Sequence, residues 1–228
     1  EPDSNNRSYL LSAYVNTDRV VIDDRAVGEQ PASGVEFYSS PESTGISGML
    51  AFRNSHKVVG KVDVTTISQI IEKQDINHVN FLKIDVEGYD FSVLKGVPWS
   101  QSKPEVIECE FEDEKTKLLG HTWRDVSEYL VGKGYSVYVS EWHPIIRYGI
   151  THDWHTIKRY PCSLEDEKAW GNLLAFRKDP GIEAIGAAVR SVVKINNPKD
   201  KEKISLGSSP PKNRSIKSSL YVRIANRL

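Results

Sequence analysis

The chain has 228 residues, of which 39% are hydrophobic and 9% aromatic. This composition is typical of a globular domain and excludes disorder along the whole length, and no apolar run approaches the ~18–20 residues of a membrane-spanning helix. The 30 Lys and Arg nearly balance 31 Asp and Glu, and this net charge of −1 argues against a nucleic-acid binder, which usually carries a basic excess.

The first third of the chain alternates helix and strand signals. Helix starts are marked by side chains that can accept backbone N–H groups, and strands by short β-branched runs. In chain order, these signals predict a helix through Leu10 and Tyr14 capped by Asp3 or Ser4, strands at 19–22 and 35–38, and a helix through Ile67 and Ile71 capped by Thr65 or Thr66.

The middle of the chain continues this alternation. The signals predict a strand at 81–86, a helix through Phe91 and Leu94 that ends at Gly96, a strand at 106–111, a helix between Thr122 and Gly134, and strands at 135–139 and 173–176. Strands that alternate with helices indicate an α/β sheet covered by helices on both faces.

The last fifty residues differ in composition from the rest. Apolar residues recur at helical spacing from Ile182 to Val193, and residues 196–219 are rich in Pro, Gly, Ser and Lys. From Asp179 onward ten Lys and Arg face four Asp and Glu. We therefore expect a domain over 1–178, then an amphipathic segment and a basic, flexible tail over 179–228. The tail could touch anionic lipid or nucleic acid, although a solvated terminus is the simpler interpretation.

The two cysteines, Cys109 and Cys162, lie far apart in the sequence. They form neither a disulfide framework nor a metal-ligand cluster, and they suit a reducing, cytoplasmic setting. No feature of the sequence indicates an oligomeric state.

Acidic residues follow the predicted strand at 81–86. Asp85 and Glu87 are two residues apart and share a face of an extended chain, and Gly88 permits a sharp turn. Ligands of open α/β sheets bind beyond the carboxyl ends of the strands. The two carboxylates could hold a cation, orient an ammonium or sulfonium group, or act as a general base; the alternative is a solvated strand end with a helix-capping acid.

Two further groups of residues could carry chemistry. Glu108 and Glu110 share one face of the strand at 106–111, which could line a site or an exposed sheet edge. The segment 142–155 contains two tryptophans and three histidines. His152 and His155 could share one face of a helix as metal ligands or bases, but an aromatic loop over a substrate pocket is the interpretation that we favour.

Several of these motifs together resemble the FkbM family of S-adenosylmethionine-dependent methyltransferases. The resemblance rests on F-L-K-I-D-V-E-G at 81–88, L-K-G at 94–96 and K-P-E-V-I-E-C-E at 103–110, with supporting likeness at 24–29, 35–38, 134–135 and 171–174. It covers roughly residues 1–178.

The resemblance implies a Rossmann-like sheet of strand order 3-2-1-4-5-7-6 with an antiparallel seventh strand. Glu1-Pro2 looks like the acidic end of the second strand, whose carboxylate takes the cofactor ribose hydroxyls, and Asp24 and Ala26 match the segment after the third strand. The family's first strand and glycine-rich loop would precede Glu1. We therefore expect an amino-terminally truncated methyltransferase, a sheet without its first strand, and weak cofactor binding by this piece alone.

The implied reaction is methyl transfer from S-adenosylmethionine to a hydroxyl of a small-molecule or glycan-like acceptor. Asp85 and Glu87 are the expected site-wall carboxylates, and Glu110 and His152 the candidates for acceptor contact or proton removal; no metal is expected. Two alternatives stay open. The acidic pair could hold a divalent cation in a sugar transferase, or the chain could be a non-catalytic remnant that serves as an interaction module.

Overall fold

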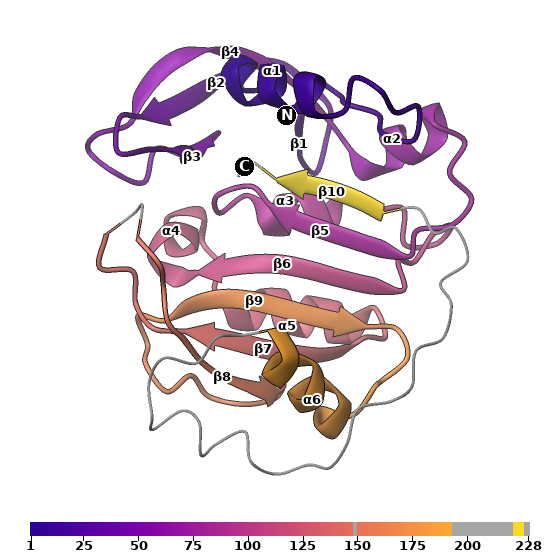
Figure 1. Cartoon of the computed structure of the whole chain (residues 1–228), viewed down its shortest axis with the longest axis vertical. Helices are drawn as coiled ribbons and strands as arrows, with labels where there is room; N and C mark the ends of the chain where they lie inside the picture. Colours follow the sequence, from indigo (N-terminus) through magenta and orange to yellow (C-terminus); the bar gives the residue numbers. More distant parts are fainter. Residues whose placement is uncertain (148–149, 193–220, 226–228) are drawn as a thin grey trace. The chain divides into compact units, whose positions relative to one another are not determined.

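The computed structural model describes residues 1–147, 150–192 and 221–225 (Figure 1). The chain divides into two compact units: the first holds Glu1–His78, Lys83–Lys103 and Val222–Leu228, and the second holds Val79–Leu82 and Pro104–Tyr221. None of the helices in these described ranges has the length and apolar character that crossing a bilayer requires.

The first unit begins with helix α1 (Ser4–Ala13). Asp3 caps this helix, because its carboxylate accepts the backbone N–H groups of Asn5 and Asn6 over 2.9 Å each. A four-stranded sheet follows, in the order β1-β4-β2-β3. Its strands are β1 (Ala26–Val27), β2 (Ala32–Ser40), β3 (Ser43–Gly48) and β4 (Lys57–Thr65). β1 runs parallel to β4, while β2 is antiparallel to both β3 and β4.

The first unit continues with two short helices whose caps agree with the sequence. Helix α2 (Ile67–Lys73) begins after Thr66, whose hydroxyl accepts the Gln69 N–H, and helix α3 (Asp90–Lys95) ends at Gly96. Strand β5 (Phe81–Asp85) is shared: Phe81 and Leu82 belong to the second unit, and Lys83–Asp85 to the first. Strand β10 (Tyr221–Ala225) neighbours β5.

The sheet of the second unit has the order β5-β6-β9-β7-β8. Its strands are β6 (Val106–Glu112), β7 (Ser136–Trp142), β8 (Trp154–Arg159) and β9 (Trp170–Phe176). β9 lies antiparallel between β6 and β7, and β8 is antiparallel to β7. The order β5-β6-β9-β7 agrees with the 4-5-7-6 part of the expected sheet, in which the seventh strand is antiparallel; β8 is an added edge strand.

Helices cover both faces of this second sheet. Helix α4 (Asp113–Thr116) and the 3-10 turn η1 (Lys117–Leu119) follow β6, α5 (Trp123–Gly132) contacts β7, and α6 (Ile182–Val192) contacts β8. Figure 1 shows α5 behind the strands and α6 in front of them. A capping box begins α5: the Thr122 backbone N–H donates to Asp125 Oδ2 over 2.7 Å, and the Thr122 side chain accepts the N–H of Asp125.

Apolar side chains of the strands and helices form a buried core in each unit. In the first unit Ile46, Val93 and Leu94 are fully buried, and in the second Ile107, Leu130 and Leu173 are. Leu82 and Ile84 of β5 are also fully buried. Lys83 lies between them, and because successive side chains of a strand point to opposite faces, it points away from the side that they share. The Lys83 ammonium lies 3.6 Å from Asp85 Oδ2 on the same strand.

One sequence-based assignment is wrong, and one alternative considered for His152 and His155 does not hold. Residues 19–22 form no strand: Val20 and Val21 are exposed, and no strand among the described residues pairs with them; β1 starts at Ala26. His152 and His155 do not share a helix, since Trp154–Arg159 is the strand β8. Strands β3, β4 and β8 were missed because their sequences lack a clean alternation of apolar residues. Residues 196–219 of the expected tail lie outside the described residues, and the domain division at 178/179 stays a prediction.

Candidate functional site

The acidic turn that follows β5 lies in the first unit. β5 ends at Asp85, and one carboxylate oxygen of Asp85 lies within 4.8 Å of one of Glu87. Both residues are buried. Burying two carboxylates this close together is costly unless cations or hydrogen-bond donors surround them. Lys83 supplies one positive charge, 3.6 Å from Asp85.

The backbone of this turn is strained at a side-chain-bearing residue. Glu87 has φ 55°, in the left-handed region that residues other than Gly, Asn and Asp seldom adopt, and Gly88 follows with φ 97°. The Gly88 N–H donates to Asp90 Oδ2 over 3.3 Å, which ties the turn to the start of α3. Strain of this kind is often held at functional sites, where it aims a particular side chain. Here it directs the fully buried Glu87 carboxylate.

The second group of predicted cofactor residues lies around the start of the chain, also in the first unit. The backbone nitrogen of Glu1 donates to the Asp23 carbonyl oxygen over 2.7 Å, so Glu1 lies beside the segment that contains Asp24 and Ala26. Glu1 Oε1 accepts the Asp3 N–H over 2.9 Å, and burial raises the pKa of the Glu1 carboxyl. Asp24 is exposed and Ala26 is buried.

Asp23 forms an ion pair with Arg25 within this group. Arg25 donates from Nε to Asp23 Oδ1 over 2.8 Å and from Nη2 to Oδ2 over 2.7 Å. These hydrogen bonds, with help from Lys73, lower the pKa of Asp23 to about 2. Two bonds of this kind orient the guanidinium on the carboxylate.

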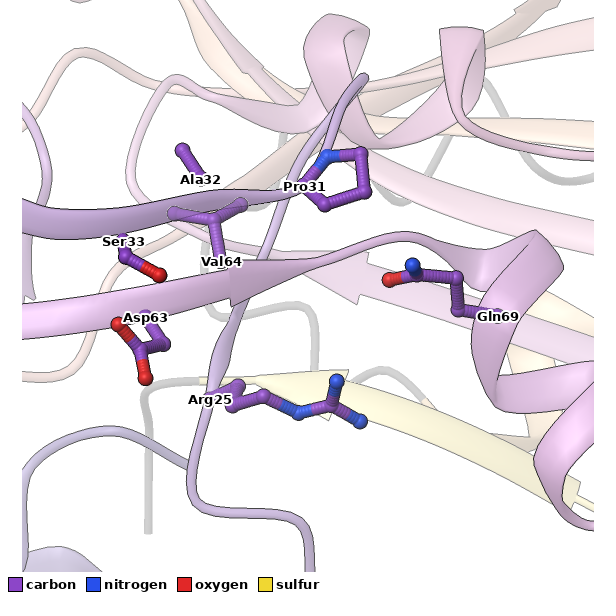
Figure 2. A pocket seen from close by; sticks show the side chains of 7 residues that line it. All are labelled: Arg25, Pro31, Ala32, Ser33, Asp63, Val64 and Gln69. Atoms are coloured by element: carbon purple, nitrogen blue, oxygen red, sulfur yellow. The ribbon is translucent and has the colours of Figure 1, made fainter.

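An open hollow of about 440 Å³ lies next to this ion pair. It is lined by residues of β2, of β4 and of the segments beside them: Arg25, Pro31, Ala32, Ser33, Asp63, Val64 and Gln69 (Figure 2). None of the predicted cofactor or catalytic residues lines it. Its size falls in the range of small-ligand sites, but its one cationic group, Arg25, is already engaged by Asp23.

Glu110 lies in the second unit, near the carboxyl end of β6. It is buried together with Glu112 and with Lys115, whose side chain is only 1% exposed. Lys115 Nζ lies 2.6 Å from Glu112 Oε2 and 3.5 Å from Glu110 Oε2. The sequence analysis singled out Glu110 without its counter-ion; the i,i+3 spacing of Glu112 and Lys115 was the available signal.

His152 belongs to a cluster of aromatic and imidazole rings in the second unit. Its ring lies edge-on to Trp170, with 5.3 Å between centroids, and Trp170 lies 5.5 Å from Trp142. The rings of His143 and His155 are stacked, 4.4 Å apart at 13°. The cluster stands at the carboxyl end of β7, because Trp142 is the last residue of β7 and pairs with Trp170 and Trp154.

Glu141 precedes Trp142 in β7 and lies next to this cluster, and sequence reasoning missed it. It is 1% exposed and its carboxylate accepts the backbone N–H groups of Glu165 and Asp166. Its Oε1 lies 3.8 Å from His155 Nδ1, and its Oε2 lies 3.9 Å from Lys158 Nζ. The signal in the sequence was an acid inside the otherwise apolar and small run V-Y-V-S-E-W.

The model of the methyltransferase FkbM domain matches residues 1–137. No curated protein and no solved structure matches the chain.

Proposed function

The chain belongs to the FkbM family of methyltransferases, and from this premise we propose that it transfers the methyl group of S-adenosylmethionine to a hydroxyl of a small-molecule or glycan-like acceptor. The family match is the observation that carries the proposal. It spans more than half of the chain and includes the acidic turn at Asp85 and Glu87.

The residues proposed for the cofactor all lie in the first unit. S-adenosylmethionine carries an electrophilic methyl group on a positively charged sulfur, together with a ribose diol. The Glu1 carboxylate is suited to accept both ribose hydroxyls, with Asp24 and Ala26 beside it. Asp85 and Glu87 supply negative charge, which attracts a sulfonium or ammonium group. The strained turn holds the Glu87 carboxylate, and Lys83 lies beside the Asp85 carboxylate, so the turn presents buried acidic groups that suit the cationic parts of S-adenosylmethionine.

The acceptor must lose a proton as its oxygen attacks the methyl carbon. Glu110 and His152 are proposed to contact the acceptor. The protein mainly aligns acceptor, methyl carbon and sulfur, because holding reactants in line replaces a bimolecular encounter with an intramolecular step.

Substitution of Asp85 by Asn tests the proposal. Asn preserves the shape of the side chain but removes the charge, so we expect the affinity for S-adenosylmethionine and the rate of methyl transfer to fall by about tenfold or more, as loss of one well-placed charge costs roughly 1.5–3 kcal/mol. Calorimetry with S-adenosylmethionine measures the binding, and release of S-adenosylhomocysteine in the presence of a panel of methyl glycosides measures the rate.

The matched control is Asp18→Asn, an identical change at an exposed residue of the same unit. It should bind S-adenosylmethionine like the unaltered chain. If Asp85→Asn and the unaltered chain bind and react equally well, Asp85 has no part in the site. Because this piece alone is expected to bind the cofactor weakly, both measurements are made at high S-adenosylmethionine concentration; if the unaltered chain then neither binds nor consumes it, the proposed function itself is wrong.

A further inference from the structure

We propose that the hollow beside Arg25 is a binding site for an uncharged sugar ring. Every residue that lines it belongs to the first unit, so the site is complete within that unit. The inference goes beyond the proposed function, because binding of a sugar here requires neither the cofactor nor a transfer step.

A β-bulge shapes one end of the hollow. The pairing of β2 with β4 shifts between Ala32 and Val35, so that Ser33 and Gly34 together lie opposite Asp63 alone. Gly34 has φ 69°, in the left-handed region that glycine adopts without strain. A bulge interrupts the regular alternation of side chains and re-aims those beside it. Figure 2 shows Ser33 and Asp63 together at the left end of the hollow.

This end of the hollow offers a hydrogen-bond acceptor. Asp63 Oδ1 accepts the Gly34 N–H over 3.3 Å, which holds the side chain across the bulge. Within the part of the chain that the structure describes, Asp63 Oδ2 accepts no hydrogen bond and the Ser33 hydroxyl makes none. An ionised carboxylate oxygen can only accept, whereas a hydroxyl can either accept or donate. Both side chains are exposed, so a ligand can reach them.

The other side of the hollow offers donors. Arg25 uses Nε and Nη2 to bind Asp23, while its Nη1 makes no hydrogen bond with the described residues. The Thr65 hydroxyl donates to Gln69 Oε1 over 2.9 Å, which leaves the Gln69 amide N–H groups to the hollow. Figure 2 shows Gln69 at the right and Arg25 below. Donors that are already oriented lose less conformational entropy when a ligand binds.

Apolar surface lies between the two polar ends. Figure 2 shows Pro31 and Val64 there, between Ser33 and Gln69. The C–H groups of a sugar ring can pack on this surface while its hydroxyls reach the polar groups around it. Binding sites for small molecules commonly combine apolar walls with a few placed polar groups in this way.

The charges around the hollow favour an uncharged ligand. The hydrogen bonds with Asp23 raise the pKa of Arg25, and the negative charges of Asp24 and Asp63 act in the same direction. Lys73 Nζ lies 3.8 Å from Asp23, so three carboxylates face two cations. A phosphate, sulfate or carboxylate ligand would therefore meet a net negative charge. A metal ion would find one carboxylate, that of Asp63, among the described residues that line the hollow.

Sugar hydroxyls suit both ends of this arrangement. Each hydroxyl can donate one hydrogen bond and accept others. One hydroxyl of the ring can therefore donate to Asp63 Oδ2, while another accepts from Arg25 Nη1 or from the Gln69 amide. A ligand that only accepts would leave the Asp63 carboxylate without a donor, and a ligand that only donates would leave the Arg25 and Gln69 groups without an acceptor.

The first experiment measures binding alone. The ¹⁵N-labelled full chain is titrated with methyl glycosides of glucose, galactose, mannose, xylose and N-acetylglucosamine, and nuclear magnetic resonance spectra are recorded. At least one glycoside should shift the Gly34 backbone amide and the Gln69 side-chain amide. The dissociation constant should be about 1 mM, the affinity expected for a ligand of this small size. The amide of Gly132, in the second unit, should not shift.

The second experiment removes one group at a time. Asp63→Asn keeps the oxygen that accepts the Gly34 N–H but replaces the charged acceptor by a donor, so the affinity for the glycoside should fall about tenfold or more. Ser33→Ala removes an exposed hydroxyl and should weaken binding by about twofold to tenfold. Asp18→Asn, at an exposed residue of the same unit, is the matched control and should bind like the unaltered chain. If Asp63→Asn does not fold, Ser33→Ala decides.

The ribose of S-adenosylhomocysteine is a second source of the same hydroxyl chemistry. The glycoside titration is therefore repeated with this compound at saturation, and the Gly34 and Gln69 signals should still respond to the glycoside. If S-adenosylhomocysteine itself shifts both signals and blocks the glycosides, the hollow belongs to the cofactor and the sugar site is wrong.

Two other outcomes would also overturn the proposal. One is that no glycoside shifts the two signals up to about 50 mM, far above the expected dissociation constant. The other is that inorganic phosphate or Mg²⁺ shifts them in place of the glycosides. Consumption of S-adenosylmethionine is measured separately. A chain that binds glycosides but consumes no S-adenosylmethionine keeps the sugar site and loses the proposed function, whereas the reverse result removes only the sugar site.

Discussion

Tyr135 and Tyr138 show how single buried groups link stability to pH in the second unit. The Tyr135 hydroxyl donates to the Pro104 carbonyl oxygen over 2.6 Å, and the Tyr138 hydroxyl donates to Asp179 Oδ1 over 2.6 Å. Burial is the main cause that raises the pKa of each tyrosine to about 12. The folded state holds these two protons more tightly than the unfolded chain does. The contribution of the two phenols to the free energy of unfolding should therefore be fully present below pH ~10 and should be lost as the pH rises toward 12.

Tyr135→Phe tests this link. The change leaves the Pro104 carbonyl without its donor, and we expect the free energy of unfolding at pH 7 to fall by about 1–2 kcal/mol. Because the variant also lacks one titrating phenol, its stability should decline less steeply between pH 10 and 12. Urea denaturation across this pH range measures both effects. Tyr9→Phe, at an exposed tyrosine, should change neither, and equal behaviour of the two variants would contradict the prediction.

Lys115 is the second residue whose effect follows from burial. With the lysine removed, Glu110 and Glu112 would remain as buried carboxylates without this counter-ion, which typically costs 3–5 kcal/mol. We therefore expect Lys115→Met to lower the free energy of unfolding by about that amount, as measured by urea denaturation.

Removing the two carboxylates as well should reverse most of this loss. The variant that combines Lys115→Met with Glu110→Gln and Glu112→Gln leaves no unpaired charge in this group, and uncharged groups cost less to bury. A triple variant no more stable than Lys115→Met alone would show that the lysine acts through packing instead.

At the scale of elements, close contact between β9 and β7 requires a glycine. A Cβ at Gly171 would lie 1.9 Å from the Ser140 carbonyl oxygen and 3.1 Å from the Phe111 ring. A backbone atom in a sheet cannot move aside without breaking the ladder. Gly171→Ala should therefore destabilise the chain by more than about 3 kcal/mol, beyond the usual range for one substitution, or prevent folding.

Gly132 provides the opposite case in the same unit. It is the last residue of α5, and nothing lies within 4 Å of a Cβ built there. Gly132→Ala should raise the free energy of unfolding by about 0.5–1 kcal/mol, because alanine favours the helix and restricts the unfolded chain. Thermal unfolding of both variants measures the contrast. A Gly171→Ala variant as stable as the unaltered chain would contradict the close approach at Gly171, and a destabilised Gly132→Ala variant would contradict the open position at Gly132.

Elements with strong local signals were predictable from the sequence. Helix α5 combines the Thr122 and Asp125 capping box with an apolar face, and the other residues of β5, Phe81–Asp85, are apolar apart from Lys83 and the terminal Asp85. β4 and β8 were not predictable, because polar side chains interrupt their pattern and their pairing with β2 and β7 holds them in place. The run at 19–22 is the converse: its residues favour a strand, but within the described part of the chain no strand pairs with it.

At the scale of the whole molecule, the division into two units predicts which residues the cofactor should protect from hydrogen exchange. All the residues proposed for the cofactor lie in the first unit. S-adenosylmethionine should therefore slow amide hydrogen exchange first in residues 1–29 and 83–90, since ligand binding suppresses the opening of the segments that it contacts. Hydrogen-exchange mass spectrometry with and without the cofactor measures this. Protection confined to residues 104–178 would contradict the assignment.

The sequence by itself determined the family, the alternation of helices and strands, the acidic turn after β5 and most of the helix caps. These features depend on residues that are close together along the chain, so local spacing is enough to show them. Only the tertiary structure decided that Glu141 faces His155, that Lys115 pairs with Glu110 and Glu112, and that His152 packs on Trp170. Such contacts depend on strand register and on which side chains are excluded from water, and neither can be read from the spacing of residues along the chain.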